Sequence, residues 1–137
     1  MSRLRVIALG FDPATARKTL AGVRLFNGAA ALLVPGLLLR RLGAGPHDRS
    51  GVYPFRMFGI RTILIGSDLL LLRGDDLRRA AQLAVLIHGC DMVSAAAAGL
   101  RGDLPRKPAV ITTALSATNT GLALFASREQ REEATTA

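Results

Sequence analysis

The sequence predicts an all-α fold, namely an integral membrane four-helix bundle whose interior is polar and contains ion pairs. Half of the 137 residues are hydrophobic and the mean hydropathy is +0.31, although 20% of the residues are charged. The charges gather in short blocks that separate four apolar stretches, each about as long as a helix that crosses a bilayer. Each stretch also carries a few polar residues at helical spacing on one face, where neighbouring helices can hide them from lipid.

A chain of this length is expected to form one domain. Its formal net charge is +8, but the arginines flank apolar stretches and the chain has only five Phe, one Tyr and no Trp. Basic side chains that reach lipid headgroups explain this pattern better than a nucleic-acid site does. Cys90 is the only cysteine, which excludes an intrachain disulfide and a cysteine-based metal site. The expected partner is the lipid bilayer, with no nucleic acid, metal or cofactor.

Residues 1–19 are predicted to form an interfacial arm on the membrane surface. Arg3 and Arg5 resemble the start of a signal peptide, but the apolar run after them is short and ends at Asp12. Asp12 and Pro13 are the residue types of an N-cap and a first helical position, so the first long helix should open there.

The first predicted span covers residues 20–39. Its two polar residues, Arg24 and Asn27, are three positions apart and occupy neighbouring positions of one helix face. A Pro-Gly pair at residues 35–36 should kink this helix or end its regular part. The turn-forming residues of 43–51 then predict an exposed loop.

The second predicted span, residues 55–72, contains Arg61 and Asp68, seven positions apart on nearly the same face. Each charge costs about 2.5–3.5 kcal/mol near a helix centre, whereas each large apolar residue returns only ~0.3–0.6 kcal/mol. The helix is therefore marginal alone and needs partners that hide its charges. Gly59 and Gly66 are also seven apart and predict a stripe where a neighbouring helix approaches closely.

The third predicted span covers residues 77–100. The turn before it, residues 73–76, is so short that the second and third spans should be antiparallel neighbours. His88 and Asp91 lie near the middle of the span, three positions apart on one face, and an alanine run at 95–98 suits tight packing.

The fourth predicted span covers residues 109–126, after a basic loop that contains two prolines. Thr112, Ser116 and Asn119 share one face of this helix and suit hydrogen bonds between helices. Residues 127–137 are charged and then small and polar, and are predicted to form a flexible tail.

The polar stripes of the four spans are expected to converge inside the bundle. Arg61 is expected to be neutralised within the bundle by Asp68, about two turns away on its own helix and reached only partly, or by Asp91. In antiparallel helices, residues equally distant from the connecting turn lie at similar depth, so Arg61 should be level with about residue 88 and lie beside Asp91. Asp68 lies closer to the turn, where it is expected to be freer to take up protons or to pair with Arg78.

The basic residues also bear on orientation. Nine Lys and Arg residues flank the spans on the side that would hold both termini, against six on the other side. This excess favours a multi-pass protein of the bacterial inner membrane with both termini in the cytoplasm.

The segment Phe58-Gly59-Ile60-Arg61, followed by Gly66 and Asp68, together with four spans in a short chain, resembles the small DoxX-like membrane proteins and their uncharacterised relatives. The likeness covers residues 20–126 in layout and matches specific residues only around the second span. It implies that the chain could be a membrane subunit of a quinone-linked oxidoreductase complex. No catalytic residue carries over from it.

Three functions remain open. The first is a non-catalytic membrane subunit or a binder of a hydrophobic ligand, in a homo-oligomer or a larger membrane complex. Arg24, Asn27, Arg61 and Asn119 would then contact the ligand or hold an anionic group on it.

The second function is an intramembrane acid–base enzyme of the isomerase, cyclase or hydrolase type, acting on an apolar substrate such as a terpenoid, polyketide or quinone. Asp68, His88 and Asp91 would be its catalytic proton-transfer groups. The simpler interpretation is that these residues only neutralise Arg24 and Arg61. The third function is a small oligomeric proton-coupled transporter.

Overall fold

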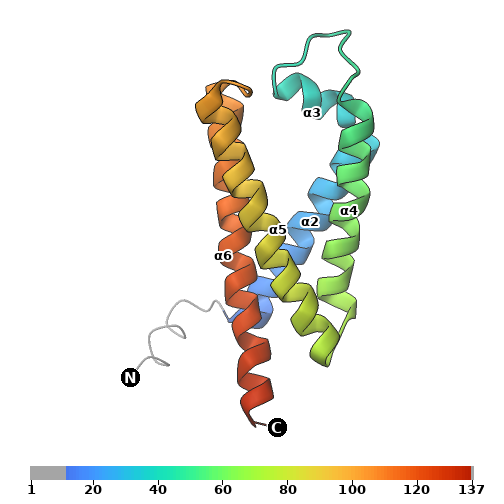
Figure 1. Cartoon of the computed structure of the whole chain (residues 1–137). Helices are drawn as coiled ribbons and strands as arrows, with labels where there is room; N and C mark the ends of the chain where they lie inside the picture. Colours follow the sequence, from blue (N-terminus) through green and yellow to red (C-terminus); the bar gives the residue numbers. More distant parts are fainter. Residues whose placement is uncertain (1–11, 137) are drawn as a thin grey trace.

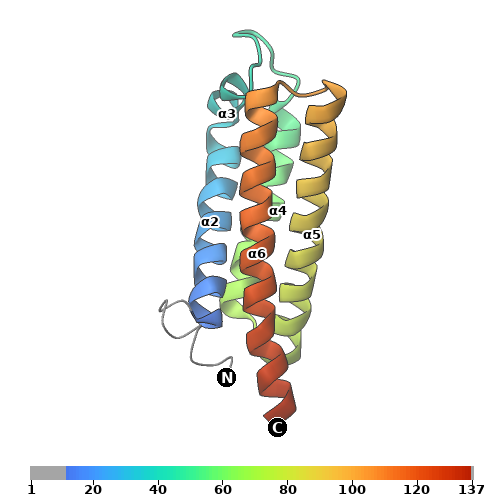
Figure 2. The ribbon, with the colours of Figure 1, turned by 90° about the vertical axis from the view of Figure 1, so that its left-hand side faces the viewer.

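The computed structural model describes residues 12–136 and the side chains as far as Arg128, and all regular structure in this part of the chain is α-helical. Four long helices lie side by side, and a short helix crosses one end of them (Figures 1 and 2). In chain order the helices are α2 (Pro13–Leu33), α3 (Pro35–Arg41), α4 (Val52–Leu71), α5 (Gly74–Arg101) and α6 (Arg106–Thr136). The prediction of an all-α fold is confirmed.

α2 begins as the sequence predicts. Asp12 has an extended backbone and its carboxylate accepts a hydrogen bond of 2.6 Å from the Thr15 N–H, and Pro13 is the first helical residue. Residues 1–11 of the predicted arm lie outside the described residues. Residues 13–19, which we assigned to the arm, instead form the first turns of α2, because the cap starts the helix at Pro13 and nothing breaks it before Leu33.

α2 ends at Leu33, and α3 continues at Pro35 with its axis turned by 100°. Pro35 has no N–H and its ring clashes with the preceding turn, which is why the predicted break occurs here. The first predicted span therefore does not run straight to residue 39. Its last part lies across the end of the bundle as α3 (Figure 1).

The long helices form two closely packed antiparallel pairs, α2 with α4 and α5 with α6, and α2 also packs against α6. α4 and α5 are joined by a short turn and run antiparallel as predicted, but they pack against each other much less (Figure 1). The partner of α4 is α2 because the glycine face of α4 is turned towards α2.

Small residues allow these close approaches. A Cβ atom at Gly59 would lie 2.7 Å from the carbonyl oxygen of Gly28, and one at Gly66 would lie 3.1 Å from a backbone oxygen of α2. The predicted glycine stripe is confirmed. Between α5 and α6, a Cβ atom at Gly99 would lie 2.6 Å from the Cβ atom of Ala109.

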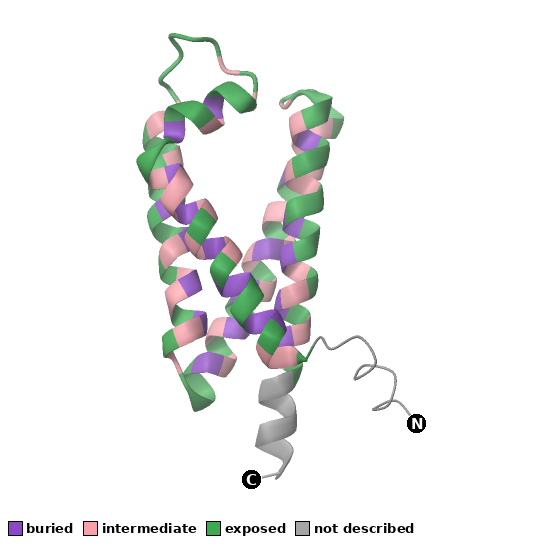
Figure 3. Ribbon diagram, turned by 180° about the vertical axis from the view of Figure 1, so that it is seen from behind, coloured by how far each residue is buried: buried purple, intermediate pink, exposed green. Residues whose placement is uncertain are grey.

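The core is built mainly from alanine, while large apolar side chains lie outside. Figure 3 shows where the buried and the exposed residues lie along the helices. Leu100 is 90% exposed and Phe26 is 75% exposed, and exposed large apolar residues occur on all four long helices. A water-soluble bundle has the opposite distribution. Small residues between helices and large apolar residues outside are typical of a bundle that lipid surrounds. The buried alanines are Ala16, Ala21, Ala31, Ala81, Ala84, Ala95, Ala109, Ala123 and Ala126.

Two helices, α5 and α6, are long and apolar enough to cross a membrane, and a third span exists if the bent pair α2 and α3 counts as one. These findings are consistent with a multi-pass membrane protein. α4, which we predicted as a span, does not qualify. Its length is sufficient, but every 18-residue stretch of it contains Arg56, Arg61 and Asp68.

The start of α2 and the end of α6 lie at the same end of the bundle (Figures 1 and 2). α6 does not end at residue 126, the predicted end of the fourth span, but continues through most of the predicted tail of residues 127–137, as far as Thr136. Residues 127–136 contain no Gly or Pro, and Arg, Gln, Glu and Ala favour helix, so nothing in this segment stops the helix.

Candidate functional site

Six polar or charged side chains are buried in the described part of the chain, and the four long helices all contribute to this set. A buried polar group without a hydrogen-bond partner costs about 1–3 kcal/mol, so such groups are rare unless something satisfies them. The six are Arg17, Arg24, Thr62, His88, Ser116 and Asn119. The candidate binding residues Arg24 and Asn119 and the candidate catalytic residue His88 are among them.

Arg24 is the buried cation of the site, with only 3% of its surface exposed. Its Cζ atom lies 5.8 Å from the centroid of the Phe58 ring, and Cζ of Arg61 lies at the same distance from that ring. Nε and Nη2 of Arg24 have no hydrogen-bond partner among the described residues. The charge of Asp91 acts on Arg24 without forming an ion pair with it.

The ion pair that the sequence predicts between Arg61 and Asp91 is present. Nη2 of Arg61 lies 3.6 Å from Oδ1 of Asp91. The two side chains are 51% and 31% exposed, so the pair bridges α4 and α5 at the edge of the bundle rather than in its interior. The predicted ion pairs of the interior are therefore not buried, since Arg24 is the only buried residue among Arg24, Arg61, Asp68 and Asp91.

His88 is fully buried on α5, and neither ring nitrogen has a hydrogen-bond partner among the described residues. The charges of Arg24 and Arg61 both act on its ring. The Thr62 hydroxyl and the Asn119 side-chain oxygen are also buried without partners among the residues described. Four side chains from four helices thus have unused hydrogen-bonding capacity.

These side chains lie at a similar depth. The contacts that fix the register of the antiparallel helices are Gly28 with Gly59, Arg61 with Asp91, and Gly99 with Ala109. In two antiparallel helices, residues that lie the same number of positions from such a contact lie at the same height. By this count, the polar groups of all four long helices lie within about one helical turn of a common level along the bundle axis. We call this set the polar layer: Arg24, Arg61, Thr62, His88, Asp91, Ser116 and Asn119.

Asp68 is not part of the polar layer. It is exposed on α4 and forms no ion pair within the described part of the chain. Arg78, its expected partner, pairs with Asp75 instead, with Nη2 3.2 Å from Oδ1. The structure brings His88 and Asp91 together with Arg61 but does not bring Asp68 to them. Asn27 is half-buried, one turn from Arg24 on α2.

Sequence analysis missed Arg17, Thr62 and Phe58. Arg17 is buried and its Nη1 donates a hydrogen bond of 2.7 Å to the Leu69 carbonyl oxygen, which ties α2 to α4. A periodic signal was available, because Arg17 precedes Arg24 by seven residues and therefore shares its face. In the same way Thr62 follows Gly59 by three residues and lies on the glycine face.

The chemistry of the polar layer follows from these groups. Arg24 can donate from two nitrogens, His88 can donate from one nitrogen and accept at the other, and Asn119 can accept at its side-chain oxygen. Among the described residues, no group of three His, Cys, Asp or Glu comes together to hold a metal ion. The layer therefore suits a polar group that contains oxygen, such as a carbonyl or a carboxylate.

Comparison of the chain with protein-family profiles, with curated proteins and with solved structures gave no match.

Proposed function

We propose that this chain is an inner-membrane protein whose four long helices cross the bilayer, with both termini in the cytoplasm, and whose polar layer binds a hydrophobic molecule through an oxygen-containing polar group. In this role the chain would be a ligand-binding protein or a non-catalytic subunit of a membrane complex. The alanine core and the apolar exterior support the membrane location.

The observation that carries this proposal is the set of buried polar atoms on Arg24, Thr62, His88 and Asn119 that have no hydrogen-bond partner within the part of the chain that the structure describes. Lipid tails cannot form hydrogen bonds with such atoms. We therefore infer that a bound ligand supplies the missing hydrogen bonds. A carbonyl or carboxylate oxygen would accept hydrogen bonds from Arg24 and His88. The apolar remainder of the ligand would then lie against the helices or in the lipid.

The boundary between α4 and α5 is the proposed entrance. These neighbouring helices pack least against each other, and the half-exposed Arg61–Asp91 pair lies between them. A molecule dissolved in the bilayer could approach the polar layer there without crossing water. The ion pair also supports α4 as a spanning helix, since it neutralises one of the charges that make this helix marginal.

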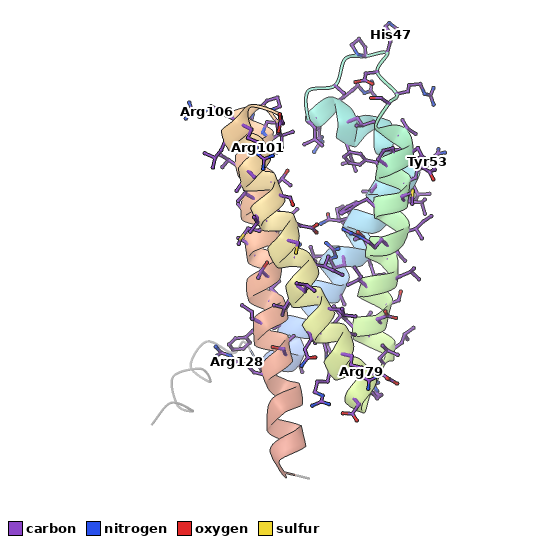
Figure 4. The ribbon with its side chains drawn as sticks, in the orientation of Figure 1. His47, Tyr53, Arg79, Arg101, Arg106 and Arg128 are labelled. Atoms are coloured by element: carbon purple, nitrogen blue, oxygen red, sulfur yellow. The ribbon has the colours of Figure 1, made fainter. Side chains whose placement is uncertain are left out.

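The test is to identify what the protein retains on purification. The wild type, Arg24→Met and His88→Leu are extracted from membranes in a mild detergent, and bound small molecules are recovered in organic solvent and identified by mass spectrometry. Arg79→Met is the matched control, because Arg79 is exposed at the end of the bundle, far from the polar layer (Figure 4).

An apolar compound with a carbonyl or carboxyl group should be enriched with the wild type and with Arg79→Met, and lost from both polar-layer variants. If all four proteins retain the same compounds in the same amounts, the polar layer is not a binding site. If the wild type is recovered in the soluble fraction without detergent, the membrane location is wrong as well.

A second candidate function is acid–base catalysis on such a ligand, and the unpartnered ring of His88 favours it. Asp91 lies one turn away on the same helix and pairs with Arg61. His88 would transfer a proton to or from the ligand, and Asp91 would set the electrostatic field around it. The test is whether the wild type converts the recovered compound into a product. If His88→Gln and Asp91→Asn still bind the compound but do not convert it, the enzyme hypothesis is favoured.

A further inference from the structure

A cavity of about 550 Å³ lies at the end of the bundle, between α3, the loop that follows it and the first turns of α4. None of its lining residues belongs to the polar layer, so it is a separate feature. Its lining has two parts. The apolar part is Leu33, Val34, Pro35, Leu37 and Val52, and the basic part is Arg40, Arg49 and Arg56.

The positive charge of the three lining arginines is not neutralised by carboxylates of the cavity itself. Asp48 is the only carboxylate in the lining, and it accepts hydrogen bonds from the Ser50 N–H at 2.9 Å and the Ser50 hydroxyl at 2.6 Å. These bonds lower the pKa of Asp48, so it stays ionised. It forms no ion pair with Arg40, Arg49 or Arg56, and neither ion pair found among the described side chains involves them. The cavity keeps an excess of positive charge.

The apolar part of the lining is open to the surroundings. Leu33 is 74% exposed, and Val34 and Leu37 are about half exposed. The 100° bend between α2 and α3 lays α3 across the end of the bundle, so these residues lie beside the arginines at the level where apolar helix gives way to polar loop. In a bilayer this is the level of the lipid headgroups.

We propose that this cavity binds the headgroup of an anionic phospholipid, with Arg40, Arg49 and Arg56 around the phosphodiester and an acyl chain against Leu33 and Leu37. Guanidinium groups bind phosphate oxygens through paired hydrogen bonds, and basic pockets between membrane helices suit such headgroups. Arg40 is already oriented, because its Nε donates a hydrogen bond of 3.3 Å to the Gly36 carbonyl oxygen. The apolar lining is the reason to propose a lipid rather than a free phosphate.

The experiment measures lipid binding to the delipidated full-length chain in detergent. Phosphatidylglycerol, phosphatidylcholine and inorganic phosphate are each titrated against the wild type, with thermal unfolding and native mass spectrometry as readouts. Phosphatidylglycerol should raise the unfolding temperature and remain bound, whereas phosphatidylcholine and inorganic phosphate should do so much less. In Arg49→Gln/Arg56→Gln the affinity for phosphatidylglycerol should fall about tenfold or more, about 1.4 kcal/mol per factor of ten.

The matched control is Arg101→Gln/Arg106→Gln, which removes the same charge from the last residue of α5 and the first residue of α6, at this same end of the bundle (Figure 4). Its affinity for phosphatidylglycerol should match that of the wild type. An equal loss in the control, or equal binding of phosphatidylcholine, would overturn the proposal. Inorganic phosphate binding as tightly as phosphatidylglycerol would overturn the choice of a lipid.

Two further variants keep the outcome clear. The single change Arg49→Gln removes a solvent-exposed loop side chain and should keep the fold if the double variant does not, while still weakening phosphatidylglycerol binding. Arg24→Met should keep the preference for phosphatidylglycerol even where it loses the ligand of the polar layer. Failure of the polar layer to bind its ligand therefore leaves the lipid site standing, whereas both proposals rest on the membrane location.

Discussion

At the scale of single residues, two side-chain contacts tie the helices together: Arg61 pairs with Asp91 between α4 and α5, and Arg17 binds the Leu69 carbonyl oxygen between α2 and α4. The short turn before α5 determines which residues of α4 and α5 lie at the same depth, so counting residues from the turn is enough to predict that Arg61 and Asp91 can meet. Burial depends on how each helix is rotated about its axis, and that rotation is set by packing between segments far apart in the chain. Arg17 contacts Leu69, 52 positions away.

The Arg61–Asp91 pair should couple the stabilities of α4 and α5. We expect Arg61→Leu and Asp91→Leu each to destabilise the protein in a bilayer, and the double variant to lose less than the two losses added together. The coupling should exceed about 1 kcal/mol, the upper end for pairs in water, because lipid screens charge poorly. Unfolding of the variants in bicelles measures it.

Asp68 provides the control for that cycle. It lies on the same helix as Arg61, and it is exposed without an ion pair among the described residues. Arg61→Leu and Asp68→Leu should therefore be additive. A coupling of Asp68 with Arg61 as large as that of Asp91 would contradict the structure.

We expect His88 to stabilise the ligand-bound protein and to destabilise the ligand-free protein. Both ring nitrogens are buried without partners among the described residues, and leucine has a similar volume without polar atoms. His88→Leu should therefore raise the free energy of unfolding of the ligand-free protein by about 1–3 kcal/mol, while abolishing ligand retention. Chemical denaturation in detergent gives the first quantity, and mass spectrometry of bound compounds gives the second. A marked loss of stability in the empty protein would show that His88 has a structural partner.

At the scale of the helices, local signals in the sequence predicted where they begin and break. Asp12 and Pro13 start α2, and Pro35 ends its straight part, because capping and the missing proline N–H act within one turn. Helix pairing could be predicted only partly. The Gly59–Gly66 stripe indicated a close neighbour but not which one, and the structure shows that this neighbour is α2.

The α2–α4 contact should tolerate no side chain at its closest point. In Gly59→Ala the new Cβ atom would lie 2.7 Å from the Gly28 oxygen, and this is backbone that cannot move away cheaply. We expect a loss of about 1–3 kcal/mol in unfolding free energy. Gly22→Ala is the control, because nothing lies within 4 Å of a Cβ atom there. It should be neutral or stabilising by up to about 1 kcal/mol, the gain in helix propensity. Equal effects of the two changes would contradict this packing.

At the scale of the whole molecule, the distribution of residues between inside and outside is the main support for the membrane location. Composition predicted an apolar protein, but it could not separate a lipid-facing surface from a large soluble core. The structure does so, because the core is mainly alanine, with a few leucines and the buried polar groups, while Leu86, Leu100 and Phe26 lie outside. Two of the three charges of α4 are accommodated in the structure. One of them is paired across to α5, and another lines the cavity near α3.

Cys90 allows the membrane location to be tested at a single atom. It is the only cysteine, and its side chain is exposed on the outside of α5 near the level of the polar layer. If lipid surrounds the bundle, a membrane-impermeant maleimide should not label Cys90 in intact membranes, although it should label the protein once it is unfolded in denaturant. Labelling of Cys90 in folded, membrane-bound protein at the rate of a loop cysteine would mean that this face is in water.

The same reagent tests the orientation when Cys90 is first changed to Ala. Ser50→Cys and Asp103→Cys place the thiol in the two loops at the end of the bundle that carries His47, Arg101 and Arg106 (Figure 4). Asp75→Cys places it at the opposite end, at the start of α5. The excess of basic residues at the end that holds both termini favours the cytoplasm for that end. The first two cysteines should therefore be labelled in intact cells, and the third only after the membrane is permeabilised. The reverse pattern would leave the bundle in the membrane and invert its orientation, which would put the arginine-lined cavity on the cytoplasmic side.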